Sequence, residues 1–245
     1  MVDFEDEQFT RLILNNLYRL GTDKINIQVN NIRELEAIHR LTTNNFLGFE
    51  ITKESKDHCS IESVTEPHDE KYEILLRRIF LIIKDCLGMI EEDFRKRDFA
   101  LNSIIERQFF KVEQFANFCM RTAIKNSGNK SSMQYLFVYD LLVMQGELKH
   151  MYEFIGQKGS TVNPKTMQLV KKIKSLFDKL YHIYFGEGFS QLPELNKELK
   201  GLLNADIYSL LPLLRGKEVV IVYHLAVFLR LLTLIISPAI ALKSE

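Results

Sequence analysis

The stretch Ile74–Ile90, ILLRRIFLIIKDCLGMI, decides the fold class because its apolar residues follow a helical period rather than a strand period. They recur every three or four positions, at Leu75, Ile79, Ile82, Cys86 and Met89. A second apolar stripe runs beside the first, at Leu76, Ile83, Leu87, Ile90 and Phe94. A helix that is apolar over so wide a face is buried among other helices, so the stretch predicts a core helix of a bundle.

Helical patterns continue through the rest of the chain after Pro67. Further helices are predicted over residues 98–126, 131–156, 163–186 and 217–242, with a shorter helical region after Pro193. Asp98 is the expected N-cap of the first of these helices, and Asn163-Pro164 starts the third, because proline suits the first turn of a helix. Residues 67–245 are therefore predicted to form an all-α helical bundle.

The first 66 residues have a different, mixed pattern. A helix is predicted from about Glu5 to Leu20, ending at Gly21, and Lys24–Val29 alternates as a half-buried strand does. Asn30 or Asn31 can cap a second helix. Two more strands are predicted, over residues 46–52 and 59–64. We therefore expect an α+β fold, in which a small helix-β-α-β-β module over residues 1–66 precedes the bundle.

Charge and cysteine content narrow the classes of function. The 245 residues contain 32 Lys and Arg and 32 Asp and Glu, so the formal net charge is zero. That balance gives no electrostatic footprint for nucleic acid, and DNA binding is not expected. Three widely spaced cysteines, at positions 59, 86 and 119, indicate reduced, buried thiols. The acidic N-terminus does not resemble a signal peptide, so a cytoplasmic location is expected.

Strict catalytic and metal motifs are absent from the sequence, and one looser constellation remains. Glu147 and His150 form Glu-x-x-His beside Asp140, a spacing that helical di-metal carboxylate proteins use. Glu106 and Glu113 on the preceding helix are seven residues apart and can face that pair. These residues give an alternative function: a metal-binding carboxylate bundle, which could also be an enzyme. The same pattern is also that of a solvated polar edge of a bundle helix, and both interpretations stay open. A second Glu-x-x-His, Glu36 to His39, lies in the N-terminal module.

The C-terminal stretch Val219–Leu242 is long and apolar enough to span a bilayer. Arg230 lies at its centre, however, and a central arginine costs about 2.5–3.5 kcal/mol on insertion scales. Pro238 also falls within the stretch. We therefore interpret it as a core helix of the bundle, with Arg230 at an edge, and expect no transmembrane span.

Taken in order, several segments make the chain similar to a known family. The chain resembles the archaeal type of PhoU-like phosphate uptake regulators over most of its length. The resemblance rests on Ile25-Asn26-Ile27, Leu47-Gly48-Phe49-Glu50, Ile61-Glu62-Ser63-Val64, Ile74 to Phe80, Val112 to Arg121 and Tyr223-His224-Leu225 to Ser237-Pro238. It implies a helical-bundle regulator that has no catalytic activity and controls phosphate uptake or signalling through protein contacts.

The resemblance also implies partners and a metal site. Its expected partner is a phosphate transporter subunit or a sensor or regulator protein, and a homodimer is a further expectation. Archaeal members often carry an N-terminal AbrB-like DNA-binding hairpin, which we do not expect in this chain. Family members often bind metal through Glu/Asp-x-x-x-Asp, but here Phe109 precedes Glu113 by four residues and Gly146 precedes His150 by four. A divalent or iron ion would therefore have to be held by Glu106, Glu113, Glu147 and His150.

Overall fold

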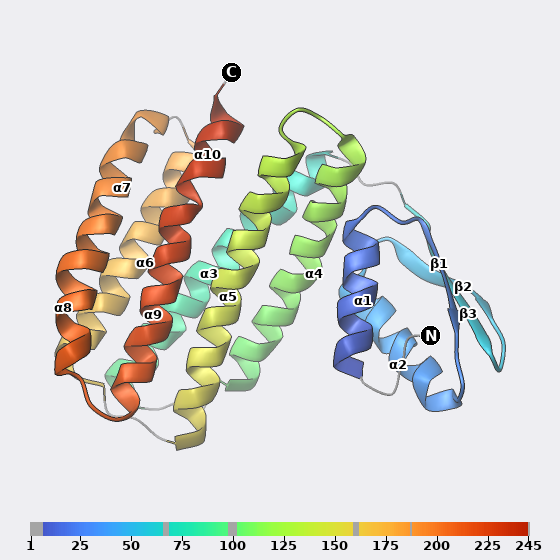
Figure 1. Cartoon of the computed structure of the whole chain (residues 1–245), viewed down its shortest axis with the longest axis horizontal. Helices are drawn as coiled ribbons and strands as arrows, with labels where there is room; N and C mark the ends of the chain where they lie inside the picture. Colours follow the sequence, from blue (N-terminus) through green and yellow to red (C-terminus); the bar gives the residue numbers. More distant parts are fainter. Residues whose placement is uncertain (1–6, 66–68, 98–101, 159–161, 187, 245) are drawn as a thin grey trace. The chain divides into compact units, whose positions relative to one another are not determined.

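The chain is described from a computed structural model, shown in Figure 1. The described residues are 7–65, 69–97, 102–158, 162–186 and 188–244. The chain divides into two compact units. The first unit comprises Met1–Arg77 and Glu113–Tyr135, and the second comprises Arg78–Val112 and Leu136–Glu245. Pro67 and Asp98, on which the expected module boundary and one expected N-cap depend, lie outside the described residues.

The first unit contains the predicted helix-β-α-β-β order. Its elements are α1 (Glu7–Arg19), β1 (Lys24–Gln28), α2 (Ile32–Asn45), β2 (Phe49–Glu54) and β3 (His58–Ser63). The three strands form one antiparallel sheet in the order β1-β3-β2. Three long helices contribute to both units: α3 (Asp69–Lys96), α4 (Asn102–Asn126) and α5 (Ser131–Lys158). An α+β chain with a small sheet near the N-terminus and a helical bundle after it is therefore confirmed.

Local sequence explains where α2 begins. The side chain of Asn31 accepts a hydrogen bond from the backbone N–H of Glu34 at 3.0 Å. The Glu34 carboxylate in turn accepts from the backbone N–H of Asn30 at 2.9 Å. The first bond satisfies a backbone donor that the helix start leaves without a partner, and the second fixes the residue before the cap. Of the two asparagines that could cap this helix, the structure uses Asn31.

The second strand starts later than the sequence pattern indicated. Phe46 is the C-cap of α2, and its backbone N–H bonds to the carbonyl of Thr42. Its ring stacks on Tyr18 with centroids 4.9 Å apart, so its apolar character serves the core rather than a strand. Gly48 turns the chain with φ 79°, and a Cβ there would lie 2.2 Å from Oγ1 of Thr65. The strand therefore begins at Phe49, after this glycine turn.

The core of the first unit lies between α1, α2 and one face of the sheet. It includes Leu14 and Tyr18 from α1, Ile38 from α2, and Ile27 and Ile61 from the strands, all almost fully buried. The opposite face of the sheet is polar, as the alternation of β1 predicted. Ser60 there donates to Asn26 at 2.9 Å across the strands.

The second unit is a helical bundle. Besides its parts of α3, α4 and α5, it contains α6 (Pro164–Phe185), a 3-10 turn (Phe189–Gln191), α7 (Leu192–Gly201), a π-helical turn η2 (Leu202–Ile207), α8 (Tyr208–Leu210), a 3-10 turn η3 (Leu211–Leu213), α9 (Lys217–Leu234) and α10 (Ile236–Lys243). The start of α6 at Asn163-Pro164 is as predicted, and the side chain of Asn163 caps the helix by accepting from the backbone N–H groups of Lys165 and Thr166. Aromatic rings fill the centre of this unit. Phe80 lies 5.4 Å from Phe177, and Phe137 stacks on Tyr184 at 4.4 Å between ring centroids.

The final helix is broken near its end. The sequence predicted one helix to residue 242, whereas α9 ends at Leu234 and α10 starts at Ile236. Pro238 explains the break because it has no N–H to bond to the carbonyl four residues earlier and its ring crowds that carbonyl. Within the described residues, Lys217–Lys243 is the one helical stretch long and apolar enough to cross a membrane, and half of its most apolar 18-residue window is buried in the protein. Arg230 is exposed at its edge.

Candidate functional site

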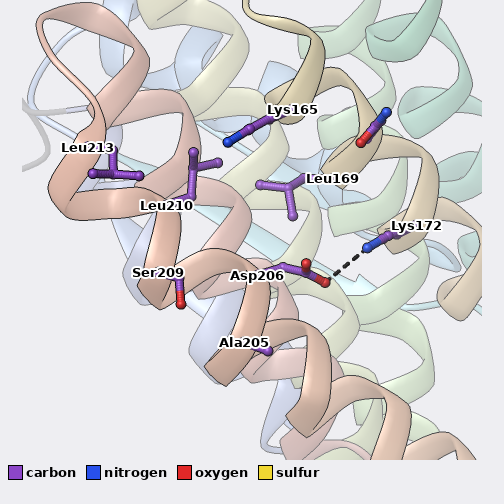
Figure 2. Close-up of a pocket in the computed structure, with 9 residues that line it drawn as sticks. Lys165, Leu169, Lys172, Ala205, Asp206, Ser209, Leu210 and Leu213 are labelled. Carbon is purple, nitrogen blue, oxygen red and sulfur yellow. Dashed lines mark hydrogen bonds and ion pairs between the residues drawn. The ribbon is translucent and has the colours of Figure 1, made fainter.

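A pocket of about 300 Å³ lies between α6 and the segment that joins α7 to α9. From α6 it receives Lys165, Leu169 and Lys172, which share one helical face because they are four and three residues apart. From the joining segment it receives residues with the same spacing: Asp206, Leu210 and Leu213. Figure 2 shows the two rows facing each other, with Lys165 and Leu169 directed toward Leu210 and Leu213.

A π-helical turn forms one wall of this pocket. The backbone N–H of Tyr208 bonds to the carbonyl of Leu203, five residues earlier, instead of to the residue four earlier. One extra residue in a turn rotates everything after it by about 100° around the helix axis, given 3.6 residues per turn. That rotation sets which residues of the 205–213 segment face α6. π-turns inside α-helices are rare and are often found at functional sites.

The charges in the pocket are unequally paired. Nζ of Lys172 lies 3.0 Å from a carboxylate oxygen of Asp206, and this ion pair closes one end of the pocket (Figure 2). The ammonium group of Lys165, at the other end, has no ion-pair partner among the described residues. Leu169 and Leu210 are buried between the two ends. The pocket therefore combines an apolar floor, a neutral end and a cationic end.

A second polar feature lies where α9 runs beside α5 (Figure 1). Nδ1 of His224 lies 2.8 Å from Oε2 of Glu147, and both side chains are largely buried. Asp140 lies two turns away from Glu147 on α5 and is 8% exposed. Its carboxyl group has no hydrogen-bond partner among the described residues, and burial raises the pKa of Asp140 to about 6. Glu147 and His224 thus pair where α5 meets α9, and Asp140 is a third buried ionisable side chain on α5.

One face of α9 is apolar and exposed. Tyr223, Val227, Arg230 and Leu234 are spaced by four, three and four residues, and we call them the outer α9 face. Tyr223 is 57% exposed and Leu234 is 62% exposed. The guanidinium group of Arg230 has no ion-pair partner among the described residues. Because large apolar side chains are costly to expose together, this face has the composition of a contact surface.

The structure places the four expected metal ligands in different surroundings. Glu113 belongs to the first unit, where Oε1 accepts from Asn15 at 3.1 Å and Oε2 lies 3.9 Å from Arg11. The other three belong to the second unit, where Glu147 pairs with His224. His150 is exposed and approaches its helical neighbour Glu153 at 3.4 Å, while Glu106 is half-buried.

No group of three or more His, Cys, Asp or Glu side chains gathers closely enough to hold a metal ion in the parts of the chain that the structure describes. The histidine of the second Glu-x-x-His also pairs with a single carboxylate: Nε2 of His39 lies 3.0 Å from Glu54 on an exposed surface. A metal site at Glu106, Glu113, Glu147 and His150 stays a prediction.

Sequence reasoning missed two parts of these sites. The sequence patterns assign His224 no partner, yet an isolated histidine among apolar residues is the signal that it needs a polar partner inside the fold. The pocket beside α6 was also missed. Its rows Lys165-Leu169-Lys172 and Asp206-Leu210-Leu213 share one spacing, but the π-turn that brings the second row to face the first leaves no recognisable sequence signal.

Comparison of the chain with protein-family models, with curated proteins and with solved structures found no match.

Proposed function

We propose that this chain is a cytoplasmic, non-enzymatic regulator of the PhoU-like kind, which controls phosphate uptake or phosphate signalling by binding another protein. Several segments resemble that family in the same order along the chain, which supports the proposal. The α+β module followed by a helical bundle supports it as well. The expected partner is a phosphate transporter subunit or a sensor or regulator protein.

The outer α9 face is the observation that carries this proposal. It exposes Tyr223 and Leu234 beside Arg230, which has no ion-pair partner in the described part of the chain. The opposite side of the helix is buried in the bundle. Interfaces are enriched in tyrosine and arginine, and their charged groups are matched by the partner. A partner that covers this face should therefore present apolar side chains and a carboxylate that reaches Arg230.

A retention experiment with the full chain tests the proposal. Tagged protein is used to recover partners from phosphate-starved and phosphate-replete cells, and the retained proteins are identified by mass spectrometry. We expect a transporter subunit, a sensor or a regulator to be retained by the wild type and lost with Leu234→Glu, because a charge would be buried in the contact. Leu81→Glu is the matched control, since Leu81 is an exposed leucine on α3. Retention of none of these proteins in either condition contradicts the proposal.

A metal-binding carboxylate bundle is the alternative, and the α5–α9 boundary is the feature that favours it. Glu147 and His224 supply two ligand types 2.8 Å apart, and Asp140 lies on the same helix as Glu147. A metal would have to separate the first two and recruit further ligands. Elemental analysis of untagged protein decides the point: about one metal per chain, lost in Glu147→Gln, supports this function, and a content well below one per chain removes it.

A further inference from the structure

The pocket between α6 and the 205–213 segment carries an inference that is independent of the proposed function, because none of its lining residues belongs to the outer α9 face. We propose that it binds a small organic anion that has an apolar body, with the anionic head at Lys165 and the body over the leucines of the floor.

The charge of the ligand follows from the pairing of the lining residues. Lys172 is neutralised by Asp206 at 3.0 Å, whereas Lys165 has no ion-pair partner among the described residues. Two lysines and one aspartate leave one positive charge unmatched in this lining, so the ligand should carry negative charge at this end. An exposed lysine is a point charge that binds either a carboxylate or a phosphate monoester, so both head groups are compatible with this end.

The apolar part of the ligand follows from the leucines. Leu169 and Leu210 form a buried floor, and Leu213 is 70% exposed beside the end that holds Lys165. A ligand with an apolar body would cover Leu213 and remove it from water, which a bare inorganic anion would not do. Leu213 is the most exposed large apolar side chain in the described part of the chain.

The size of the pocket limits the ligand. A volume of about 300 Å³ is at the lower end of the range for small-molecule sites. Because a water molecule takes about 30 Å³ of liquid, the pocket holds about ten non-hydrogen atoms. A nucleotide is too large and too highly charged, and no aromatic ring lines the pocket to stack on a base. An aliphatic or aromatic monocarboxylate of that size fits the volume, charge and floor together.

Octanoate is a suitable probe, since it has about ten non-hydrogen atoms, one charge and an aliphatic body. Binding to the full chain is measured by isothermal calorimetry and by saturation-transfer NMR, up to about 10 mM, because ligand efficiencies of about −0.3 kcal/mol per atom correspond to millimolar affinity. Octylamine has the same body and the opposite charge, and acetate has the head without the body. Octyl phosphate tests the other head group. We expect octanoate to bind and octylamine and acetate not to bind.

Variants locate the binding. Lys165→Gln is expected to weaken octanoate binding about tenfold, because it removes the charge-assisted contact. Leu213→Ser should weaken it as well, by removing the apolar contact. Lys171→Gln is the matched control, since Lys171 is an exposed lysine on the same helix that does not line the pocket. All three side chains are on the surface, and unchanged unfolding midpoints would show that the variants fold.

Three results would overturn the proposal. The first is no binding of either octanoate or octyl phosphate at 10 mM or below, and the second is octylamine binding as well as octanoate. The third is an equal loss of affinity in Lys165→Gln and Lys171→Gln, which would mean that the anion binds elsewhere. Tighter binding of octyl phosphate with the same dependence on Lys165 supports the proposal and assigns a phosphate head. None of these outcomes depends on whether a partner protein binds the outer α9 face.

Discussion

The side-chain amide of Asn15 donates a hydrogen bond to Oε1 of Glu113 at 3.1 Å, and so joins α1 to α4 across 98 residues of sequence. The carbonyl oxygen of Asn15 accepts from Asn45 and from Asn117, each at 3.2 Å. Asn15 is 1% exposed, so these polar groups have no water to replace a lost partner. One asparagine thus connects three helical elements within the first unit.

We predict that Asn15→Ala lowers the free energy of unfolding by about 1–3 kcal/mol, because it leaves the Glu113 carboxylate and two amides without their partner. Urea unfolding followed by circular dichroism measures the change. Asn16→Ala is the control, since Asn16 is the exposed neighbour on the same helix and its loss should change stability by about 0.5 kcal/mol or less. Equal effects of the two substitutions would contradict the role assigned to Asn15.

A second prediction concerns Arg121, which is 2% exposed. Its Nη1 donates to the backbone carbonyls of Tyr18 at 3.1 Å and Thr22 at 2.9 Å, and its Nη2 pairs with Asp23. The guanidinium group also lies over the Phe49 ring, 4.7 Å from its centroid. Arg121→Met should destabilise the protein by about 3 kcal/mol, because buried carbonyls lose their donor.

The matched control for Arg121→Met is Lys125→Met. Lys125 pairs with the same aspartate, Asp23, at a surface position, where an ion pair contributes about 0–1 kcal/mol. If Arg121→Met does not fold, Arg121→Lys supplies the measurement, since a lysine keeps the charge but cannot reach both carbonyls. Thermal or urea unfolding midpoints should rank wild type, Arg121→Lys and Arg121→Met in that order. If Arg121→Lys were as stable as the wild type, the guanidinium group would not be needed to hold the carbonyls of Tyr18 and Thr22, and the prediction would be contradicted.

The burial of Asp140 leads us to predict that the free energy of unfolding depends on pH in an unusual direction. Burial raises the pKa of Asp140 from 3.8 to about 6, so the folded protein binds a proton that the unfolded chain releases between these values. The contribution of Asp140 to stability therefore falls as the pH rises from about 4 to about 6. Asp140→Asn should stabilise the protein at pH 7 by about 1–3 kcal/mol and have little effect near pH 4.

Urea unfolding at pH 4.5 and pH 7 measures this difference. Asp85→Asn on α3 is the control, because Asp85 is exposed. A loss of stability in Asp140→Asn that is the same at both pH values would mean that the carboxylate has a favourable partner in the folded state, and would contradict the prediction.

The cysteines should be inert in the folded protein. All three thiols are buried, and burial raises the pKa of Cys59 and of Cys86 to about 11 and that of Cys119 further. Since the thiolate is the reactive form, about one thiol in a thousand is ionised at pH 8. We expect no labelling by iodoacetamide at pH 8 in the folded state, and three labels per chain in 8 M urea, counted by mass spectrometry.

A variant with an exposed thiol controls that experiment. Ser132 is exposed near the start of α5, so Ser132→Cys should gain one label in the folded state under the same conditions. Rapid labelling of a native cysteine at the rate of this introduced thiol would show that its surroundings open to solvent, and would contradict its burial.

Local signals predicted much of the fold. The order of the N-terminal elements followed from the alternation of Lys24–Gln28 and from the asparagine before α2, because caps and strand periods depend on a few neighbouring residues. The helices after residue 69 followed from their apolar stripes in the same way. The prediction differed from the structure at two places. Phe46 contributes to the core from a turn and not from a strand, and Pro238 interrupts the last helix despite its apolar pattern.

The candidate sites were less accessible to such reasoning. The spacing of Glu147 and Asp140 on α5 singles them out as neighbours on one face of that helix. Spacing does not predict which other helix packs against that face. That His224 is the partner of Glu147 depends on which helix packs against α5, 77 residues later in the chain. The pocket at Lys165 depends on a π-turn, whose presence is decided by how that segment packs.

By itself, the sequence determined the helical and strand segments, most of their ends and the apolar side of each, since these depend on residues within a turn or two of one another. Only the tertiary structure decided that Arg121 is buried among carbonyls, that Glu147 meets His224, and that Lys165 lies beside three leucines with no ion-pair partner among the described residues. Such pairings join segments separated by tens of residues. They depend on the free energy of packing the whole bundle, which no short pattern encodes.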